Sequence, residues 1–199
     1  MSRPTDGTAH VVLVSGSTRS GSTNTAALRT LAGLEVPGVA TTLWERLVDV
    51  PAFVPDDDAP SPPVVLALRR LLESADAVVF CTPEYAGSLP GSLKNVLDWL
   101  VGSGELYRKP VAWVTVAHPG RGEGALATLA TVLGYEGAEV VEPACVRIPV
   151  GRDLVGRDGT VHDPDTRARL TAHLATVAEH VRARAEAERG ADQPRPSRP

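Results

Sequence analysis

Val11-Val-Leu-Val-Ser-Gly16-Ser-Thr-Arg-Ser-Gly-Ser-Thr-Asn24 is the stretch that decides the fold of this chain. Its first part, Val11-Val-Leu-Val14, is a short apolar run rich in β-branched residues, which is typical of a strand buried on both faces. A polar loop with two glycines follows at once, and from Asn24 the apolar residues recur at helical spacing. The stretch therefore predicts a buried strand, a polar loop and a helix.

The same alternation of strands and helices continues along the chain. Further strands are predicted near 39–44, at 77–81, at 111–116 and around 139–148. Helices are predicted at about 63–74, 90–101, 126–133 and 164–187, and the segment 51–63, rich in Pro and Asp, is predicted to be a loop. This rhythm implies right-handed crossovers and a parallel sheet covered by helices on both faces. We expect an α/β, flavodoxin-like three-layer sandwich with a five-stranded parallel sheet of order 2-1-3-4-5, rather than a two-half dinucleotide fold.

Length, charge and cysteine content limit the class of protein. The 199 residues suit one domain, predicted over 9–188, followed by a disordered tail over 189–199. The formal net charge of -4 gives no general basic footprint for nucleic acid. The two cysteines, Cys81 and Cys145, indicate free thiols in a reducing compartment. No signal peptide and no apolar run of about 18 residues for a membrane span is found. We expect a cytoplasmic protein with neither a nucleic-acid nor a membrane partner.

The loop from Gly16 to Asn24 is predicted to bind an anion. A helix N-terminus offers unpaired N–H groups, and this loop adds hydroxyls, an amide and the guanidinium of Arg19. A simple helix cap by Ser22 or Asn24 is the alternative for either residue alone. The loop has no Gly-Lys-Ser/Thr of a P-loop and no G-x-G-x-x-G of an ordinary NAD fingerprint.

The loops after strands one, three and four meet at the carboxyl edge of such a sheet, which is where ligands bind. The second of them begins Thr82-Pro-Glu-Tyr-Ala-Gly87, and the third is His118-Pro-Gly-Arg-Gly-Glu-Gly124. Cys81 lies beside the second loop, but no arginine follows it as in a phosphatase, so a buried structural thiol is the preferred interpretation. The histidines and cysteines show no zinc spacing, and no metal site is predicted.

Two motifs in this order give the chain a resemblance to a known family. Gly16-Ser-x-Arg-x-x-Ser-x-Asn24, together with Thr82-Pro-Glu-Tyr85 and Pro90-Gly-x-Leu-Lys-Asn-x-x-Asp-Trp99, resembles the NADPH-dependent FMN reductase family. That family is flavodoxin-like and includes quinone, azo-dye and chromate reductases. The resemblance extends from about Val11 to the last helix.

The resemblance implies a set of cofactor-binding residues. The FMN phosphate would be held by Ser17, Arg19, Ser22, Thr23, Asn24 and Thr25. The ribityl chain and the ring would be lined by Pro83, Glu84, Tyr85, Ala86 and Gly87, and then by His118, Pro119, Gly120, Arg121 and Gly122. Family members often have Asn where this chain has Ala86, so Ala86 is expected to contribute only its backbone. Arg121 is expected either near the flavin or at the NADPH phosphate, or else as a solvated loop arginine.

The resemblance also implies an activity. We expect hydride transfer from NADPH or NADH through bound FMN to a small acceptor, which would be FMN, a quinone or another small molecule. The chemistry would belong to the flavin, so no catalytic side chain is assigned. A flavodoxin-type electron carrier and a non-catalytic sensor or interaction protein that has kept the fold are the alternatives. A homodimer or a dimer of dimers is expected, with Trp99 as the best interface residue. The acceptor and the preferred nicotinamide stay open.

Overall fold

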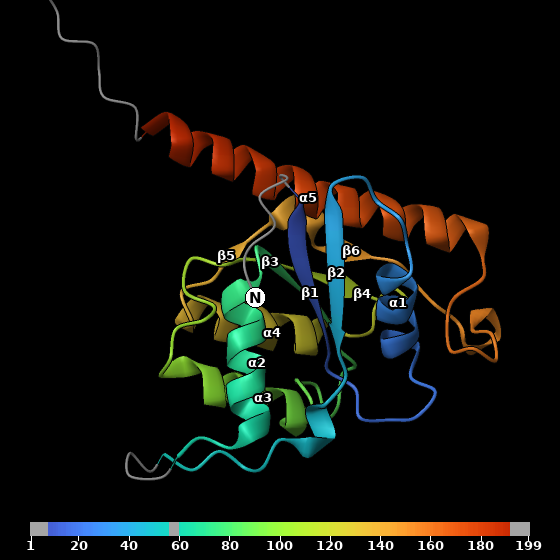
Figure 1. Cartoon of the computed structure of the whole chain (residues 1–199). Helices are drawn as coiled ribbons and strands as arrows, with labels where there is room; N and C mark the ends of the chain where they lie inside the picture. The colour runs from blue at the N-terminus through green and yellow to red at the C-terminus, as the bar shows by residue number, and fades with distance from the viewer. Residues whose placement is uncertain (1–7, 56–59, 192–199) are drawn as a thin grey trace, which may run out of the picture.

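The computed structural model describes residues 8–55 and 60–191. The strands are β1 (Ala9–Ser15), β2 (Val39–Trp44), β3 (Ala77–Cys81), β4 (Pro110–Thr115), β5 (Glu139–Val140) and β6 (Val146–Arg147). The α-helices are α1 (Thr23–Ala32), α2 (Pro63–Ser74), α3 (Gly91–Val101), α4 (Glu123–Tyr135) and α5 (Pro164–Ala191). Short 3-10 turns occur at Leu47–Asp49, Glu142–Ala144 and Arg152–Leu154. Strands and helices alternate along the chain, as predicted (Figure 1).

The sheet is parallel throughout and has the order β2-β1-β3-β4-β5, with β6 also paired to β4. The register places Val14 of β1 beside Phe80 of β3, and Phe80 beside Trp113 of β4. The predicted flavodoxin-like order is thereby confirmed. In this order the carboxyl ends of β1, β3 and β4 are neighbours, so the loops that follow them come together at one edge.

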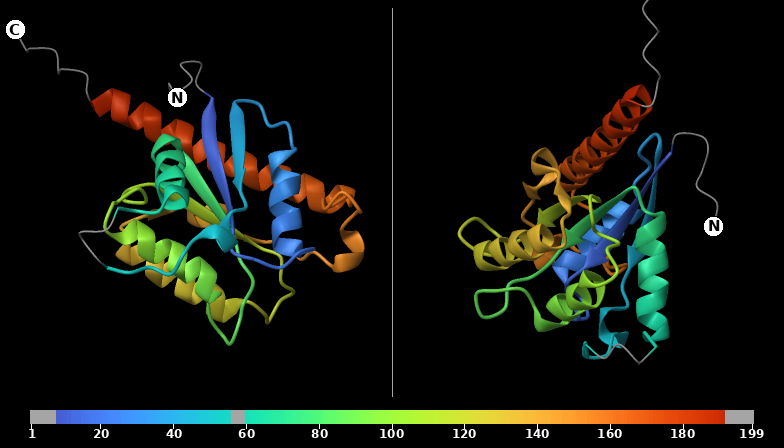
Figure 2. Two further views of the ribbon diagram at one scale, coloured as in Figure 1. Left: turned by 60° about the horizontal axis from the view of Figure 1, so that its bottom comes forward. Right: turned by 90° about the vertical axis from the view of Figure 1, so that its left-hand side faces the viewer.

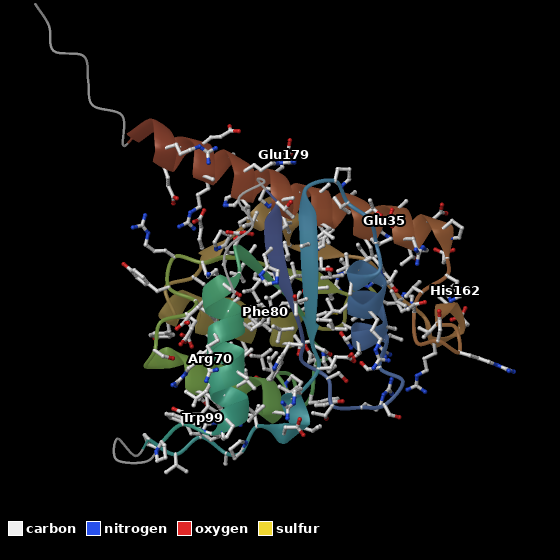
Figure 3. The ribbon with its side chains drawn as sticks, viewed as in Figure 1. Glu35, Arg70, Phe80, Trp99, His162 and Glu179 are labelled. Carbon is white, nitrogen blue, oxygen red and sulfur yellow. The ribbon has the colours of Figure 1, made fainter. Side chains whose placement is uncertain are left out.

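Each face of the sheet packs against its own set of helices. Val12 and Val14 belong to a buried cluster with apolar residues of α2, α3 and α4. Val11 and Leu13 point the other way and belong to a second cluster with α1 and α5. This alternation follows from the two-residue period of a strand, because a strand buried on both faces needs apolar residues at every position. Figure 2 shows the three layers from two sides, and Figure 3 labels Phe80 in the interior.

The predicted fifth strand over 139–148 is two short strands rather than one. The 3-10 turn Glu142–Ala144 separates β5 from β6, and both strands pair with β4. Pro143 lies in that turn and has no N–H to donate to a strand ladder, which explains the interruption.

The predicted end of the last helix is also corrected. Helix α5 extends to Ala191, so the first residues of the expected disordered tail, 189–191, are helical. An i,i+4 pair between Arg184 and Glu188, at 2.9 Å, supports this last part of the helix. Residues 192–199 lie outside the described residues, and the domain bounds 9–188 stay a prediction.

Two buried titratable side chains have pKa values shifted by their surroundings. His173 of α5 is only 3% exposed, and burial lowers its pKa to about 4. Neither ring nitrogen has a hydrogen bond of standard geometry among the described residues, and the Ala144 backbone gives only a weak opposing interaction. Glu136, after α4, is 6% exposed, and burial raises its pKa to about 7, with Glu105 and Asp98 adding to the shift. The folded protein thus favours the neutral form of both groups.

These two groups should give opposite pH dependences of stability. Folding releases a proton from His173 between pH 4 and 6.5, so stability rises with pH there. Folding takes up a proton at Glu136 between pH 4.5 and 7, so stability falls with rising pH there. The variant Glu136→Gln should gain stability over the wild type as the pH rises through that window, by roughly 2–3 kcal/mol at its upper end. Urea unfolding at several pH values measures this difference, and a pH-independent difference would contradict the assignment.

Candidate functional site

Three loops meet at the carboxyl edge of the sheet: loop one (16–22) after β1, loop two (82–90) after β3 and loop three (116–122) after β4. The loops and the helix that follows them pack so closely that two glycines have no room for a Cβ. A Cβ on Gly16 would lie 2.4 Å from Oγ1 of Thr82, and a Cβ on Gly124 would lie 2.1 Å from the carbonyl oxygen of Gly87. Loops one and two are therefore in direct contact, and loop two rests on the start of α4. Most of the predicted site residues lie in these three loops, and Thr23, Asn24 and Thr25 follow loop one in the first turn of α1.

Loop one ends at a helix N-terminus that no side chain caps. Ser22 is the N-cap of α1 and is 4% exposed, yet its hydroxyl makes no capping hydrogen bond. The backbone N–H groups of Thr23, Asn24 and Thr25 have no hydrogen-bond partner among the described residues. By contrast, Asp163 accepts the N–H of Thr166 at 2.8 Å at the start of α5. The unpaired donors and the positive end of α1 form a site for an anion.

The side chains of loop one and of the first turn of α1 divide into two groups. Asn24 and Thr25 are buried and bind within the protein, because Oδ1 of Asn24 accepts the Cys81 thiol at 3.3 Å and Oγ1 of Thr25 lies 2.8 Å from Oγ of Ser15. Arg19 is exposed. Among the described residues its side chain makes one long hydrogen bond, of 3.4 Å from Nη2 to the Gly21 carbonyl, and its backbone N–H donates to Oγ of Ser17 at 3.3 Å. Its guanidinium is therefore available to an anion, whereas Asn24 and Thr25 offer their backbone N–H groups.

Cys81 is a structural thiol, as expected. It is fully buried and donates to Asn24, and burial raises its pKa above the ordinary value for cysteine. A thiol that is protonated and inaccessible cannot act as a nucleophile.

Glu84 of loop two makes two hydrogen bonds within the protein, and its expected place along the flavin stays a prediction. Its Oε2 accepts the N–H groups of Gly124 at 2.7 Å and of Ala125 at 3.1 Å. Glu84 therefore caps α4 and joins loop two to loop three, because a carboxylate at a helix N-terminus is stabilised by the unpaired N–H groups and the dipole. Pro83 is half-buried beside it, and Tyr85 is 50% exposed at the outer part of the loop.

Loop two turns at Ala86 and Gly87. Tyr85 and Ser88 exchange two backbone hydrogen bonds of 3.0 Å, and the two residues between them have φ values of 50° and 72°. Two consecutive positive φ values are typical of a type I′ turn, in which Asn-Gly is the favoured pair. Ala86 is thus a residue with a Cβ in a left-handed conformation, which is unfavourable for it.

Replacing Ala86 by Asn should stabilise the protein. Asn tolerates a positive φ far better than Ala, so we expect a gain of about 1 kcal/mol in unfolding free energy and a melting temperature higher by about 2–4 °C. Ala86→Val should act in the opposite direction, since a β-branched residue is poorly accommodated there. Thermal melts of the two variants beside the wild type measure both effects. A melting temperature of Ala86→Asn at or below that of the wild type would contradict the account.

Loop three is exposed over residues 118–121 and ends at Gly122, the N-cap of α4, with a φ of 86°. Residues His118, Pro119, Gly120 and Arg121 thus lie at the outer part of loop three, and their expected contact with the flavin stays a prediction. The Arg121 side chain has no hydrogen bond or ion pair among the described residues. Arg19 and Arg121 accordingly give this edge two exposed cations.

Arg147, at the end of β6, was not selected from the sequence. Its Nη1 donates to three carbonyl oxygens of the segment around loop three, those of Ala117, His118 and Arg121, at 2.9, 3.1 and 2.8 Å. Its Nη2 pairs with Glu123 at 2.6 Å. The one sequence signal for it is a charged residue inside an apolar strand-like run.

Metal ligands, membrane spans and pockets elsewhere in the described part of the chain bear on where the site lies. They contain no group of His, Cys, Asp and Glu side chains arranged to hold a metal ion, and none of their helices is long and apolar enough to cross a membrane. A pocket of about 580 Å³ lies at the opposite end of the sheet, where His10, Ala75 and Pro110 are among its lining residues. Because ligands of parallel α/β sheets bind at the carboxyl ends of the strands, we place the site at the three loops and not in that pocket.

Comparison with known proteins shows the family of the chain. The sequence pattern of the NADPH-dependent FMN reductase family matches residues 9–152. The chain belongs to this family. It is 43% identical over 90 residues to an NAD(P)H-dependent FMN reductase of Pseudomonas aeruginosa, a match that covers 45% of this chain and 48% of the relative. It is 38% identical over 92 residues to a quinone reductase of Escherichia coli, covering 45% and 49%. The chain spans about half the length of these curated relatives.

A solved structure supports the same family assignment. The flavoenzyme NAD(P)H:(acceptor) oxidoreductase of Paracoccus denitrificans superposes with a TM-score of 0.70 at 27% identity, covering 87% of this chain and 97% of that one.

In the present chain, two residues of the motif after loop two, Asn95 and Trp99, make contacts within the protein. Asn95 accepts the Phe53 N–H at 2.7 Å and donates to the Pro51 carbonyl at 2.9 Å, and the Trp99 indole N–H also donates to Pro51 at 2.9 Å. These residues hold the segment after β2 against α3.

Proposed function

We propose that the protein is an FMN-dependent NAD(P)H oxidoreductase that passes electrons to FMN, a quinone or another small acceptor. The observation that supports this proposal most strongly is the uncapped N-terminus of α1 beside Arg19, in a chain of the NADPH-dependent FMN reductase family. When bound, FMN supplies the hydride-accepting chemistry. The relatives named as FMN and quinone reductases support the same class of reaction.

The protein's own groups would bind and orient the cofactor. The N–H groups of Thr23, Asn24 and Thr25, with Arg19 and the Ser17 and Ser22 hydroxyls, fit a phosphate in both charge and donor type. Loops two and three, fixed to each other through Glu84, would present backbone groups to the ring. The exposure of Tyr85 and of residues 118–121 fits a shallow site that a nicotinamide and an acceptor occupy in turn.

The proposal is tested by the absorption spectrum of the purified protein, followed by assays of NADPH and NADH oxidation with a panel of acceptors. We expect a bound flavin spectrum and ping-pong kinetics, because both substrates would use one exposed face. A protein that binds FMN without oxidising either nicotinamide would be an electron carrier of the flavodoxin type. A protein that binds no added FMN would support a non-catalytic interaction role without flavin and contradict the proposal.

A homodimer and a cytoplasmic location belong to the same proposal. Apolar side chains are exposed in the segment that Trp99 holds against α3: Val48 is 69% exposed, Phe53 39% and Val54 60%. The Phe53 and Trp99 rings meet edge to face with centroids 5.1 Å apart. Figure 3 labels Trp99 near the bottom of the molecule in that view. An exposed apolar group of this kind is typical of a subunit contact. Sedimentation velocity measures the oligomeric state, and a monomer at micromolar concentration would contradict the dimer.

A further inference from the structure

We propose that Arg147 is a positioning residue for the flavin, which acts by fixing loop three from the β6 side. This inference rests on the proposed function, because it concerns how the same site is shaped. Arg147 itself lies on the β6 side of loop three and is assigned no contact with the cofactor.

The contacts of Arg147 are concentrated on one short piece of backbone. The two hydrogens of its Nη1 are shared among the carbonyl oxygens of Ala117, His118 and Arg121, all within 3.1 Å. The side chain is 23% exposed, so these contacts are partly shielded from water. Hydrogen bonds from a charged donor are stronger than neutral ones, and three of them on five consecutive residues fix the path of the loop.

The position of Arg147 is itself fixed at both sides. In the sheet it pairs with Thr115, two residues before the loop begins to turn, and the next residue, Ile148, donates to the Thr115 carbonyl at 2.8 Å. From α5, Arg169 donates to the Arg147 carbonyl at 2.7 Å. These contacts therefore hold the backbone of Arg147 beside the end of β4, next to loop three.

The contacts determine which way the loop's donors face. In a trans peptide the C=O and the following N–H point in opposite directions. Because the carbonyls of Ala117 and Arg121 face Arg147, the N–H groups of His118 and Gly122 face away from it. Neither N–H has a hydrogen-bond partner among the described residues. The contacts of Arg147 thereby orient two unpaired donors, one on the exposed residue His118 and one on the buried residue Gly122.

The far end of the loop is held by a different residue. Glu84 accepts the N–H groups of Gly124 and Ala125, just beyond Gly122. The first turn of α4, which follows loop three, is thus held by Glu84, and loop three itself is held through its carbonyls by Arg147. Removal of Arg147 leaves the α4 cap in place and should release the outer part of the loop alone.

The test compares two flavins, FMN and riboflavin, which lacks the phosphate. Fluorescence titration of Arg147→Met should show binding of both flavins weakened by the same factor, about tenfold, because the loop would act on the ring and not on the phosphate. Arg147→Lys keeps the charge but not the planar fork, so it should weaken both flavins by a smaller common factor. Arg157→Met, at an exposed arginine before α5, makes the same charge change away from the loops and should leave both affinities unchanged.

Unchanged affinity of Arg147→Met for both flavins, or a loss confined to FMN, would overturn the inference. If that variant shows no cooperative thermal unfolding, Arg147→Lys decides the question, and wild-type affinity of the lysine variant for riboflavin would overturn it. A wild-type protein that binds neither flavin would instead overturn the proposed function, so the two failures are distinct.

Discussion

Replacing Gly124 by Ala is expected to destabilise the protein by about 3 kcal/mol and to weaken FMN binding at least about 100-fold. The added Cβ would lie 2.1 Å from the Gly87 carbonyl oxygen and 3.1 Å from Oε2 of Glu84. The clash is with backbone, which cannot rotate away as a flexible side chain can. Loop two and the start of α4 would have to separate, and the Glu84 cap would be strained with them.

Gly134→Ala is the matched control for this variant. Gly134 lies in the same helix α4, and a Cβ there would meet nothing within 4 Å. Because Ala is a better helix former than Gly, the control should gain up to about 1 kcal/mol. Urea unfolding and FMN titration of the two variants measure the contrast. Equal behaviour of the two would contradict the close contact between loop two and the start of α4.

Replacing Arg19 by Ala is expected to weaken FMN binding about 10–100-fold while leaving riboflavin binding unchanged. Arg19 is the one cation in loop one, and its guanidinium is exposed beside the unpaired N–H groups of α1. Loss of a charge-assisted hydrogen bond to a phosphate has an effect of this size. The fold should be unaffected, because the side chain makes a single long hydrogen bond within the protein.

Arg29→Ala serves as the control for net charge. Arg29 lies on α1 but pairs with Glu45 at 2.6 Å on the exposed side of the helix. Its loss changes the total charge by the same amount without reaching loop one, so FMN affinity should stay within about twofold at physiological salt. Equal losses of FMN affinity in both variants would indicate a general charge effect and contradict a role of Arg19 at the phosphate.

Most of the fold follows from local patterns in the sequence. Two runs are apolar at every position, Val11-Val-Leu-Val14 and Ala77–Cys81, which identifies strands buried on both faces. The polar loop after Val14 marks the carboxyl end of the first strand and the start of the first helix. The strand order then brings the three loops together without further information. The division of the fifth strand at Pro143 depends on how one turn fits against β4, which a run of apolar residues does not reveal.

The candidate site was predictable where a residue acts through its own local backbone. Ser22 at the start of α1 and Gly87 in the turn of loop two are of this kind. Glu84 and Arg147 are different, because their partners lie 40 and 24–30 residues away in the sequence. A carboxylate beside a tyrosine and an arginine in a strand have no local signal for a helix cap or a loop contact. Such roles arise only from the packed arrangement of β3, β4 and β6.

The central claim is that loop one holds the phosphate of FMN. The most direct measurement is the ratio of the affinities of the wild-type protein for FMN and riboflavin, which differ by that phosphate alone. The account predicts that FMN binds about 100-fold or more tightly than riboflavin, and that Arg19→Ala removes most of this advantage. Equal affinities for the two flavins in the wild-type protein would contradict it.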